Sequence, residues 1–177
     1  MRERPQTTDR RRQPYIMKHF KAKIISNKKI APEHYILSFR IPKNIEEIKP
    51  GQFFNVRVKD ACQPFLRRPF GAHNIRKDNI EILYKVVGNG TRILSGRVKG
   101  ELLDVIGPLG NGFSLPPGFA RNRQGREPAI FLVAGGHGIA PLYALARKLY
   151  RRRRNNSRFT VLIGARTRRH VVCDKKF

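Results

Sequence analysis

The stretch RPFGAHNIRKDNIEILYKVVGNGT, residues 68–91, decides how this chain folds. It predicts one β-strand over 70–75 and a second over 80–87, each with the period-two pattern of a half-buried strand. The stretch ends in Gly88-Asn89-Gly90-Thr91, and the residues that follow, 91–95, are short and helix-like. These residues therefore predict two strands and then a glycine-rich turn that opens a short helix.

The same alternation continues on both sides of this stretch. Apolar residues alternate with polar ones over 20–24, 35–41, 54–58 and 102–106, and turns rich in Pro, Gly and Asn separate the segments. Six such strands predict an antiparallel barrel, which we place at residues 17–118. A Gly- and Pro-rich stretch, 107–128, follows the last strand, and we assign 119–128 as a linker.

Beyond the linker the pattern changes to that of an α/β protein. Ala129 to Ala134 is a continuous apolar run, which predicts a parallel strand buried on both faces. Leu142, Leu145, Ala146 and Leu149 share one face of a predicted helix, and 159–163 forms a second strand. Residues 129–177 thus predict a partial parallel βαβ nucleotide-binding domain. Because such sheets usually have four or more strands, we expect further residues to complete it.

The charge of the chain is strongly positive and uneven. There are 38 Lys and Arg against 12 Asp and Glu, a net charge of +26, and 15 of the basic residues lie in 121–177. Such a field attracts polyanions, but few aromatic residues are interleaved with it, so nucleic-acid binding is not expected as the main role. Residues 1–16 have no periodicity and predict a disordered basic extension, with Met17 as a possible natural start.

Cysteine content and hydropathy exclude several classes of protein. Two cysteines cannot form a disulfide framework, and they cannot supply the four ligands of an iron–sulfur cluster. No metal site is expected. No apolar stretch is long enough to span a membrane and no secretory signal is present, so we expect a cytoplasmic protein.

Several segments have residue types that bind phosphate. Glycines at 135, 136 and 138, between a buried strand and a helix, allow a diphosphate to approach the backbone, although a tight turn without ligand has the same pattern. Arg68 can hold a phosphate in two hydrogen bonds, or can be an ordinary surface charge. Gly90 and Thr91 begin a short helix, where backbone N–H groups and the Thr91 hydroxyl could also bind a phosphate. No side chain is singled out as catalytic.

Three segments together carry a resemblance to a known family. They are 65–70, FLRRPF; 83–91, LYKVVGNGT; and 103–113, LDVIGPLGNGF. Over residues 18–177 the chain resembles the ferredoxin–NAD(P)H reductase superfamily, and within it the electron-transfer subunits of NAD-dependent dihydroorotate dehydrogenase. The resemblance implies a flavoprotein oxidoreductase component that binds FAD and uses NAD(P)H as co-substrate.

The resemblance also implies roles for individual residues. The flavin and its diphosphate would be lined by Arg68, Pro69, Phe70 and Gly71. The adenosine side would be contacted by Leu83, Tyr84 and Lys85, and the diphosphate by Gly90 and Thr91. The nicotinamide dinucleotide would be approached by Gly135, Gly136 and Gly138. Gly71 stands where the family usually has Ser, and the cysteines of the family's [2Fe–2S] centre are absent from this chain.

The function implied is electron transfer between NAD and a dihydroorotate dehydrogenase catalytic subunit, in a hetero-oligomer that serves pyrimidine biosynthesis. Two alternatives stay open. One is the flavin subunit of another NAD(P)H reductase complex, of sulfhydrogenase or transhydrogenase type, and the other is a basic binding module without redox activity. Arg166, Arg168 and Arg169 follow the second strand of the nucleotide domain and could meet the 2′-phosphate of NADP, or could be ordinary surface.

Overall fold

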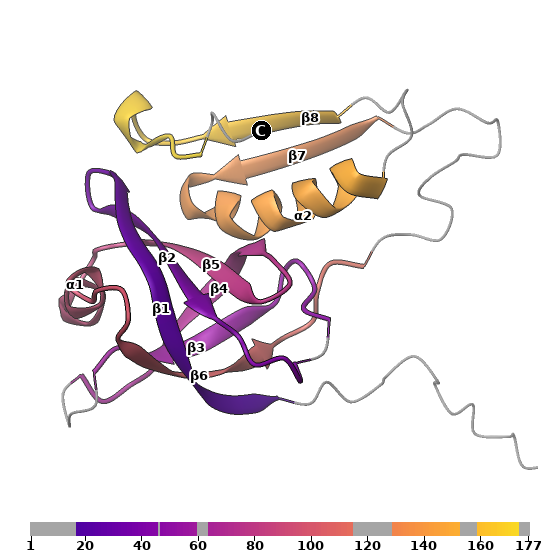
Figure 1. The fold of residues 1–177 in the computed structure, drawn as a ribbon. Coiled ribbons are helices and arrows are strands. Elements are labelled where there is room, and N and C mark those ends of the chain that lie inside the picture. Colours follow the sequence, from indigo (N-terminus) through magenta and orange to yellow (C-terminus); the bar gives the residue numbers. More distant parts are fainter. Residues whose placement is uncertain (1–16, 46, 60–63, 115–128, 153–158, 174–177) are drawn as a thin grey trace, which may run out of the picture.

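The computed structural model of the chain describes residues 17–45, 47–59, 64–114, 129–152 and 159–173. The basic extension expected at 1–16 and the linker expected at 119–128 lie outside these ranges. Figure 1 shows that the described residues form two units, a barrel below and a smaller α/β unit above it.

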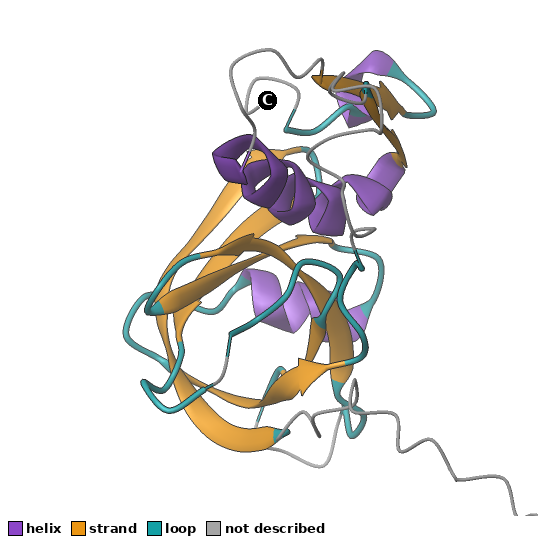
Figure 2. Cartoon of the chain, turned by 90° about the vertical axis from the view of Figure 1, so that its right-hand side faces the viewer, coloured by secondary structure: helices purple, strands orange, loops and turns teal. Residues whose placement is uncertain are grey.

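Residues 18–109 form a closed antiparallel barrel, as predicted. Its strands are β1 (Lys18–Ala31), β2 (His34–Arg40), β3 (Phe53–Arg57), β4 (Arg68–Ile75), β5 (Asn79–Lys85) and β6 (Leu102–Leu109). Around the barrel they follow the order β1-β2-β5-β4-β3-β6, and β6 pairs with β1 to close it. Figure 2 looks into the closed ring of strands. Gly107 to Leu109, which the sequence placed in a turn-rich stretch after the strand, are the last residues of β6.

The longest strand, β1, closes the barrel by pairing with two neighbours. Its first part, Lys18–Lys23, pairs with β6, and its second part, from Ile24 onward, pairs with β2. The pairing with β2 shifts register between Ile24 and Ser26 and again near the end of the strand. Such irregularities bend a strand, which lets one strand serve both sides of a barrel.

Inward-facing apolar side chains fill the barrel. Phe39 and Phe54 are fully buried and meet edge to face, with ring centroids 5.7 Å apart. The short helix α1 (Asn89–Ser95) covers one end of this core with Leu94, which is also fully buried. The Asn27 side chain of β1 donates hydrogen bonds to the carbonyl oxygens of Leu94 and Arg97, 2.8 and 3.0 Å away, and so fixes the end of α1 to the barrel wall.

The second unit is the predicted βαβ unit. It contains β7 (Ile130–Gly135), a 3₁₀ turn η1 (Gly136–Gly138), α2 (Ile139–Arg152) and β8 (Phe159–Gly164), followed by a second 3₁₀ turn, η2 (Arg168–His170). The two strands are parallel and in register from Ile130 opposite Phe159 to Gly135 opposite Gly164. The predicted apolar face of α2 packs on this sheet, where Leu132, Leu145, Ala146 and Leu149 form one buried cluster.

The prediction that the first of these strands is buried on both faces is wrong for this chain. Along β7, Phe131 is 64% and Val133 is 70% exposed, while Leu132 and Ala134 are buried. On β8, Leu162 is 52% exposed. The α2 helix covers only one side of the two-stranded sheet, and among the described residues no element covers the other. The strand does have apolar side chains on both faces, but only the face toward α2 is packed against another element.

The two units contact each other through α2 and a shared apolar cluster. Figure 1 shows α2 between the β7–β8 sheet and the barrel. Ile36 and Leu83 of the barrel pack with Ala134, Ile139 and Ala140 of the second unit. These contacts hold the glycine turn that precedes α2 against strands β2 and β5.

Candidate cofactor site

Two separated parts of the predicted site meet at the starts of β4 and α1. A Cβ atom placed on Gly90 would lie 2.8 Å from Nε and 3.0 Å from Nη2 of Arg68, so the guanidinium group lies directly on the glycine. Nη1 of Arg68 also donates a hydrogen bond to the carbonyl oxygen of Leu66. The arginine charge is therefore held at the beginning of a helix, where backbone N–H groups add to the positive potential.

The neighbouring arginine has a different and structural role. Nη2 of Arg67 lies 2.5 Å from Oδ1 of Asp104 on β6, and its Nη1 donates to the Asp104 carbonyl oxygen over 2.9 Å. Burial would raise the pKa of Asp104, but hydrogen bonds from Arg67, His19 and Lys21 outweigh it and lower the pKa to about 2. Arg67 therefore binds to Asp104 of β6, whereas Arg68 lies against Gly90 of α1.

The Thr91 hydroxyl closes the turn before α1. Its Oγ1 accepts hydrogen bonds from the N–H groups of Val87 and Gly88, at 3.0 and 3.2 Å, and donates one to the carbonyl oxygen of Gly88. These three bonds use the single donor and both lone pairs of a hydroxyl. Thr91 was predicted to contact a diphosphate. In the structure its side chain instead shapes the turn that presents Gly90.

The two aromatic residues of the predicted site point into the barrel. Tyr84 is 2% and Phe70 is 9% exposed, and their ring centroids lie 5.7 Å apart. The Tyr84 hydroxyl donates to Oδ1 of Asn27 over 3.0 Å, and burial raises the pKa of this tyrosine well above its usual range. Because side chains alternate along a strand, the residues next to them face outward.

The outward-facing residues of β4 and β5 lie toward the second unit. Pro69 is exposed, and a Cβ atom on Gly71 would lie 3.9 Å from Cδ of Pro141 in α2. Leu83 is covered by the shared apolar cluster. Nζ of Lys85 pairs with Oε2 of Glu33 at 3.4 Å. The outer face of these two strands is thus bounded by the Arg68–Gly90 contact on one side and by the α/β unit on the other.

A cationic pocket lies where Lys85 meets the glycine turn. It has a volume of about 270 Å³, and none of its lining residues is acidic. The lining residues are His34, Lys85, Gly136, His137, Ala165, Arg166 and His170. Gly136 has a φ of +50°, a left-handed conformation that favours glycine. Of the three predicted turn glycines, Gly136 is the one that lines the pocket, while Gly135 ends β7 and Gly138 ends η1.

Three histidines from different elements converge in this pocket. The rings of His34 and His137 stack at 5.0 Å with only 9° between their planes, and His170 meets His34 edge-on at 6.2 Å. Nδ1 of His34 lies 2.6 Å from the carbonyl oxygen of Pro32. Burial lowers the pKa of His137, and the nearby His34 and Lys85 lower it further. An anion bound here would meet a lysine, an arginine and imidazole groups.

The described residues contain no group of three His, Cys, Asp or Glu side chains that could hold a metal ion. Cys173 is buried, with its Sγ 3.8 Å from Nε2 of His73, and Cys62 lies outside the described residues. Within the described part of the chain, no helix is both long and apolar enough to cross a membrane.

A family model for the oxidoreductase FAD-binding domain matches residues 21–113, more than half of the chain and nearly the whole barrel. The chain belongs to this FAD-binding family. The barrel is thus the part by which the family is defined, and the βαβ unit follows it.

Two curated relatives of this FAD-binding protein carry the same name. The electron transfer subunit of dihydroorotate dehydrogenase B (NAD(+)) from Desulforamulus reducens is 36% identical over 165 residues, which are 92% of this chain and 58% of that protein. The protein of the same name from Bacillus velezensis is 37% identical over 137 residues, which are 75% of this chain and 50% of that protein. The chain therefore spans about half the length of the curated relatives it matches.

Two solved structures with similar folds are ferredoxin–NADP oxidoreductases. An NADH-dependent reduced ferredoxin–NADP oxidoreductase superposes with a TM-score of 0.70 at 29% identity, over 87% of this chain and 52% of that chain. A ferredoxin–NADP⁺ reductase from Neisseria gonorrhoeae, solved with bound FAD and NADP, has a TM-score of 0.69 at 16% identity, over 90% of this chain and 62% of that one. At that identity the second likeness shows the fold alone.

The residues of the FAD-binding protein fit a dinucleotide cofactor on the outer face of β4 and β5. Arg68 lies on a glycine at which no larger side chain fits unless the arginine moves, and the backbone of α1 begins beside it. Sequence reasoning identified Arg68, Gly90, Lys85 and Gly136, which the structure places at this face or in the adjoining pocket. It missed His34 and His170, because nothing in the sequence links positions that far apart. Of the three arginines considered for a 2′-phosphate, Arg166 lines the pocket.

Proposed function

We propose that this chain is the FAD-binding part of an electron-transfer subunit that passes electrons between NAD(P)H and a partner protein. The observation that carries the proposal is the contact between Arg68 and Gly90, which places a cation and a helix start together on a barrel of the FAD-binding family. The domain limits remain those suggested by the sequence: barrel at 17–118, linker at 119–128 and nucleotide-binding part at 129–177.

In this proposal the chain holds FAD through three groups of residues. Arg68 and the backbone at Gly90 bind the diphosphate, in the way that arginines and helix starts bind phosphate oxygens. Pro69 and Gly71 form the wall on which the flavin ring lies, and the absence of a side chain at Gly71 leaves that wall open next to Pro141. Phe70 and Tyr84 support this wall from inside the barrel.

The nucleotide would enter from the second unit. The pocket formed by Lys85, Gly136 and Arg166 is cationic and lies at the glycine turn before α2, so it suits the diphosphate of NAD(P)H. Bound FAD would accept a hydride from the nicotinamide and pass electrons on one or two at a time. No side chain in the described site is required as an acid or base for that step, and the protein's part is to place the two cofactors.

The partner in this proposal is the catalytic subunit of a dihydroorotate dehydrogenase. The names of the curated relatives support it, since they describe an electron transfer subunit of that enzyme. The complex would serve pyrimidine biosynthesis in the cytoplasm, and its [2Fe–2S] centre would be held outside the 177 residues of this chain. Co-purification of the two subunits with electron transfer from dihydroorotate to NAD would support this pairing, and failure to associate would contradict it.

FAD uptake and reduction test the cofactor part of the proposal directly. We expect the purified chain to bind FAD one to one, to show flavin absorption bands, and to lose them when NADH is added without oxygen. Arg68→Ala should weaken FAD binding strongly. The matched control Arg40→Ala, an exposed arginine at the end of β2, should not. A chain that folds but takes up no FAD would refute the proposal.

A further inference from the structure

A second and larger cavity lies at the opposite end of β4, between the barrel and α2. Its volume is about 350 Å³, and it is lined by the segment between β2 and β3, by the end of β4 and its following turn, and by α2. Arg68 begins β4 and Ile75 ends it, so an extended strand places this cavity about 20 Å from the Arg68–Gly90 contact. It shares no lining residue with the pocket at Lys85.

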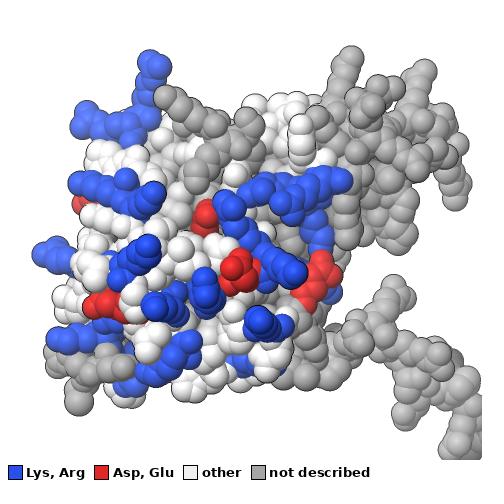
Figure 3. Space-filling model, in the orientation of Figure 1, with Lys and Arg blue, Asp and Glu red and all other residues white. Residues whose placement is uncertain are grey.

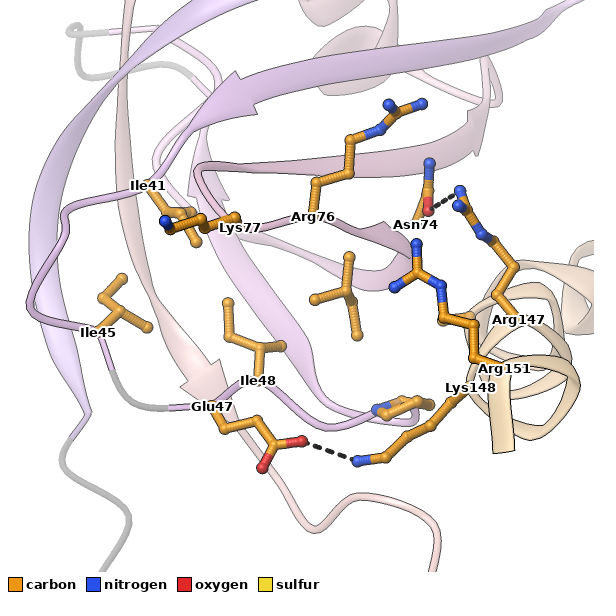
Figure 4. Close-up of a pocket in the computed structure, with 13 residues that line it drawn as sticks. Ile41, Ile45, Glu47, Ile48, Asn74, Arg76, Lys77, Arg147, Lys148 and Arg151 are labelled. Carbon is orange, nitrogen blue, oxygen red and sulfur yellow. Dashed lines mark hydrogen bonds and ion pairs between the residues drawn. The ribbon is translucent and has the colours of Figure 1, made fainter. Parts of the chain in front are cut away.

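The floor of this cavity is apolar. Four isoleucines from the barrel line it: Ile41, Ile45, Ile48 and Ile75. Ile48 is 6% exposed and belongs to the barrel core, and the other three are partly buried beside it. Figure 4 shows Ile41, Ile45 and Ile48 on the barrel side of the cavity, across from Arg147 and Arg151 of α2. Such a floor favours an aliphatic or aromatic body over a fully polar ligand, because burial removes apolar surface from water.

The helix α2 provides the cationic side of the cavity. Ala144, Arg147, Lys148 and Arg151 line it, with the i, i+3, i+4, i+7 spacing of a single helical face. This face is distinct from the leucine face that packs on the β7–β8 sheet. The turn after β4 adds Arg76 and Lys77, so the lining contains five cations and one acidic residue, Glu47.

Some of these cations are fixed by partners. Nη1 of Arg147 donates to Oδ1 of Asn74 over 2.8 Å, and Asn74 is only 2% exposed, so a buried side chain holds this guanidinium in place. Nζ of Lys148 bonds to Glu47 at 2.9 Å, and Arg76 lies 3.6 Å from Glu81.

The remaining two cations, Lys77 and Arg151, have no ion pair or hydrogen bond to any described residue. Both are exposed. Figure 4 shows Arg151 extending from α2 toward the barrel side of the cavity, near Arg147. A single anionic group at this mouth would add a second negative charge to a lining that has five cations and only Glu47 as an acidic residue.

We propose that this cavity binds a small amphiphilic carboxylate, with its apolar body on the four isoleucines and its carboxylate at Arg151 of α2. The volume lies within the range of small-molecule sites. A second copy of this chain is a poor occupant, because two molecules of net charge +26 repel each other. Figure 3 shows how widely lysine and arginine side chains spread over one face of the molecule. The proposal does not depend on the flavin function, because none of its residues belongs to the FAD or nucleotide sites.

Octanoate, 1-octanol and acetate separate the two requirements of this site. In isothermal titration calorimetry on the whole chain, we expect saturable one-to-one binding of octanoate, and much weaker binding of 1-octanol and acetate. Arg151→Glu should weaken octanoate binding about tenfold, the value of one charge-assisted contact. Lys77→Glu, on the other side of the cavity, should weaken it less. The matched control Lys99→Glu changes an exposed lysine in the turn before β6 and should bind octanoate normally.

The NMR signals of isoleucine methyl groups can show where octanoate binds on the protein. In a sample labelled with carbon-13 at the isoleucine methyls, octanoate should shift the signals of Ile41, Ile45, Ile48 and Ile75 and leave those of Ile36 and Ile139 in place. Adding FAD or NADH should not displace octanoate. Absence of saturable binding, equal binding of 1-octanol, shifts centred on Ile36 and Ile139, or unchanged affinity in Arg151→Glu would each overturn the proposal. Concentration-dependent shifts without ligand, with dimers in sedimentation, would assign the cavity to a second copy of the chain and would also overturn it.

Discussion

Replacing Gly90 with alanine should separate cofactor binding from folding. The φ angle of Gly90 is not in the left-handed region, so alanine fits the backbone, and alanine is more favourable than glycine within a helix by about 1 kcal/mol. The added Cβ would lie 2.8 Å from Nε of Arg68, which is too close. Because a guanidinium group ends a flexible side chain, it can move away at small cost to the fold. We expect Gly90→Ala to be as stable as the parent, or slightly more stable.

The cost of the substitution should appear in FAD affinity. If Arg68 holds the FAD diphosphate, its displacement removes at least one charge-assisted hydrogen bond, worth about 1.5–3 kcal/mol. That free energy corresponds to a dissociation constant raised about 10- to 150-fold. Arg68→Ala should cause a loss of similar size, since both substitutions remove the same contact.

A double-mutant cycle makes this prediction quantitative. FAD titration of the parent, Gly90→Ala, Arg68→Ala and the double variant gives four binding free energies, and urea unfolding of the same proteins gives four stabilities. The double variant should bind FAD about as weakly as Arg68→Ala alone, because once the arginine is gone the extra methyl group has nothing to displace. Unchanged FAD affinity in Gly90→Ala would refute the assignment of Arg68 to the diphosphate. Losses that add in the double variant would show that the glycine acts by another route.

Three further predictions concern stability and pH. Asp104→Asn should lower the free energy of unfolding by about 2 kcal/mol at pH 7, because the folded carboxylate has a pKa of about 2 against 3.8 for the ordinary group. The stability that the Asp104 carboxylate adds is fully present above pH 4 and is lost as pH falls toward 2. In urea unfolding, the difference in stability between Asp104→Asn and the parent should therefore be smaller at pH 3 than at pH 7. The control Asp78→Asn, on an exposed turn, should change the stability little at either pH. Binding of ADP-ribose should strengthen as pH falls from about 7 to 5.5, since a diphosphate raises the depressed pKa of His137 and binding takes up a proton. His137→Gln should reduce this pH dependence, although His34 and His170 line the same pocket. A parent protein without pH dependence would contradict the assignment. Gly107→Ala would place a Cβ 2.3 Å from Cδ1 of the fully buried Phe54 ring, and thermal unfolding should report a loss of about 1–3 kcal/mol, with an unchanged midpoint arguing against this close packing.

The strand pattern of the barrel could be predicted because one side of each strand faces a core. Ile80, Ile82 and Tyr84 belong to the barrel core at every second position of β5, and that spacing is visible in the sequence. The length of β1 could not be predicted in the same way. Its alternation breaks after Ile24, where the strand changes partners from β6 to β2 and the register shifts. A period-two pattern predicts a strand that keeps the same face toward the core. It does not predict one that changes its pairing partner part-way along.

The candidate site was predictable only in part, for a related reason. Arg67 and Arg68 are adjacent and chemically identical, and only the position of Asp104 on β6 shows that the first is structural. The Thr91 hydroxyl closes a local turn through hydrogen bonds that the sequence does not reveal. Tyr84 faces the core because its register on β5 is set by pairing with Tyr35 on β2. Each distinction depends on a contact between residues far apart in the chain or on a local hydrogen bond.

The closure of the barrel has a consequence for synthesis on the ribosome. Every strand needed to close it lies within residues 18–109, and its closing pair joins the first strand to the last. The hydrogen-bonded ring can therefore form as soon as β6 has left the exit tunnel, while the βαβ unit is still being made. Phe131, Val133 and Leu162 would then emerge next to an already folded neighbour, whose surface offers α2 a place to dock. A chain made in this order presents the apolar strands β7 and β8 only after the barrel core is complete.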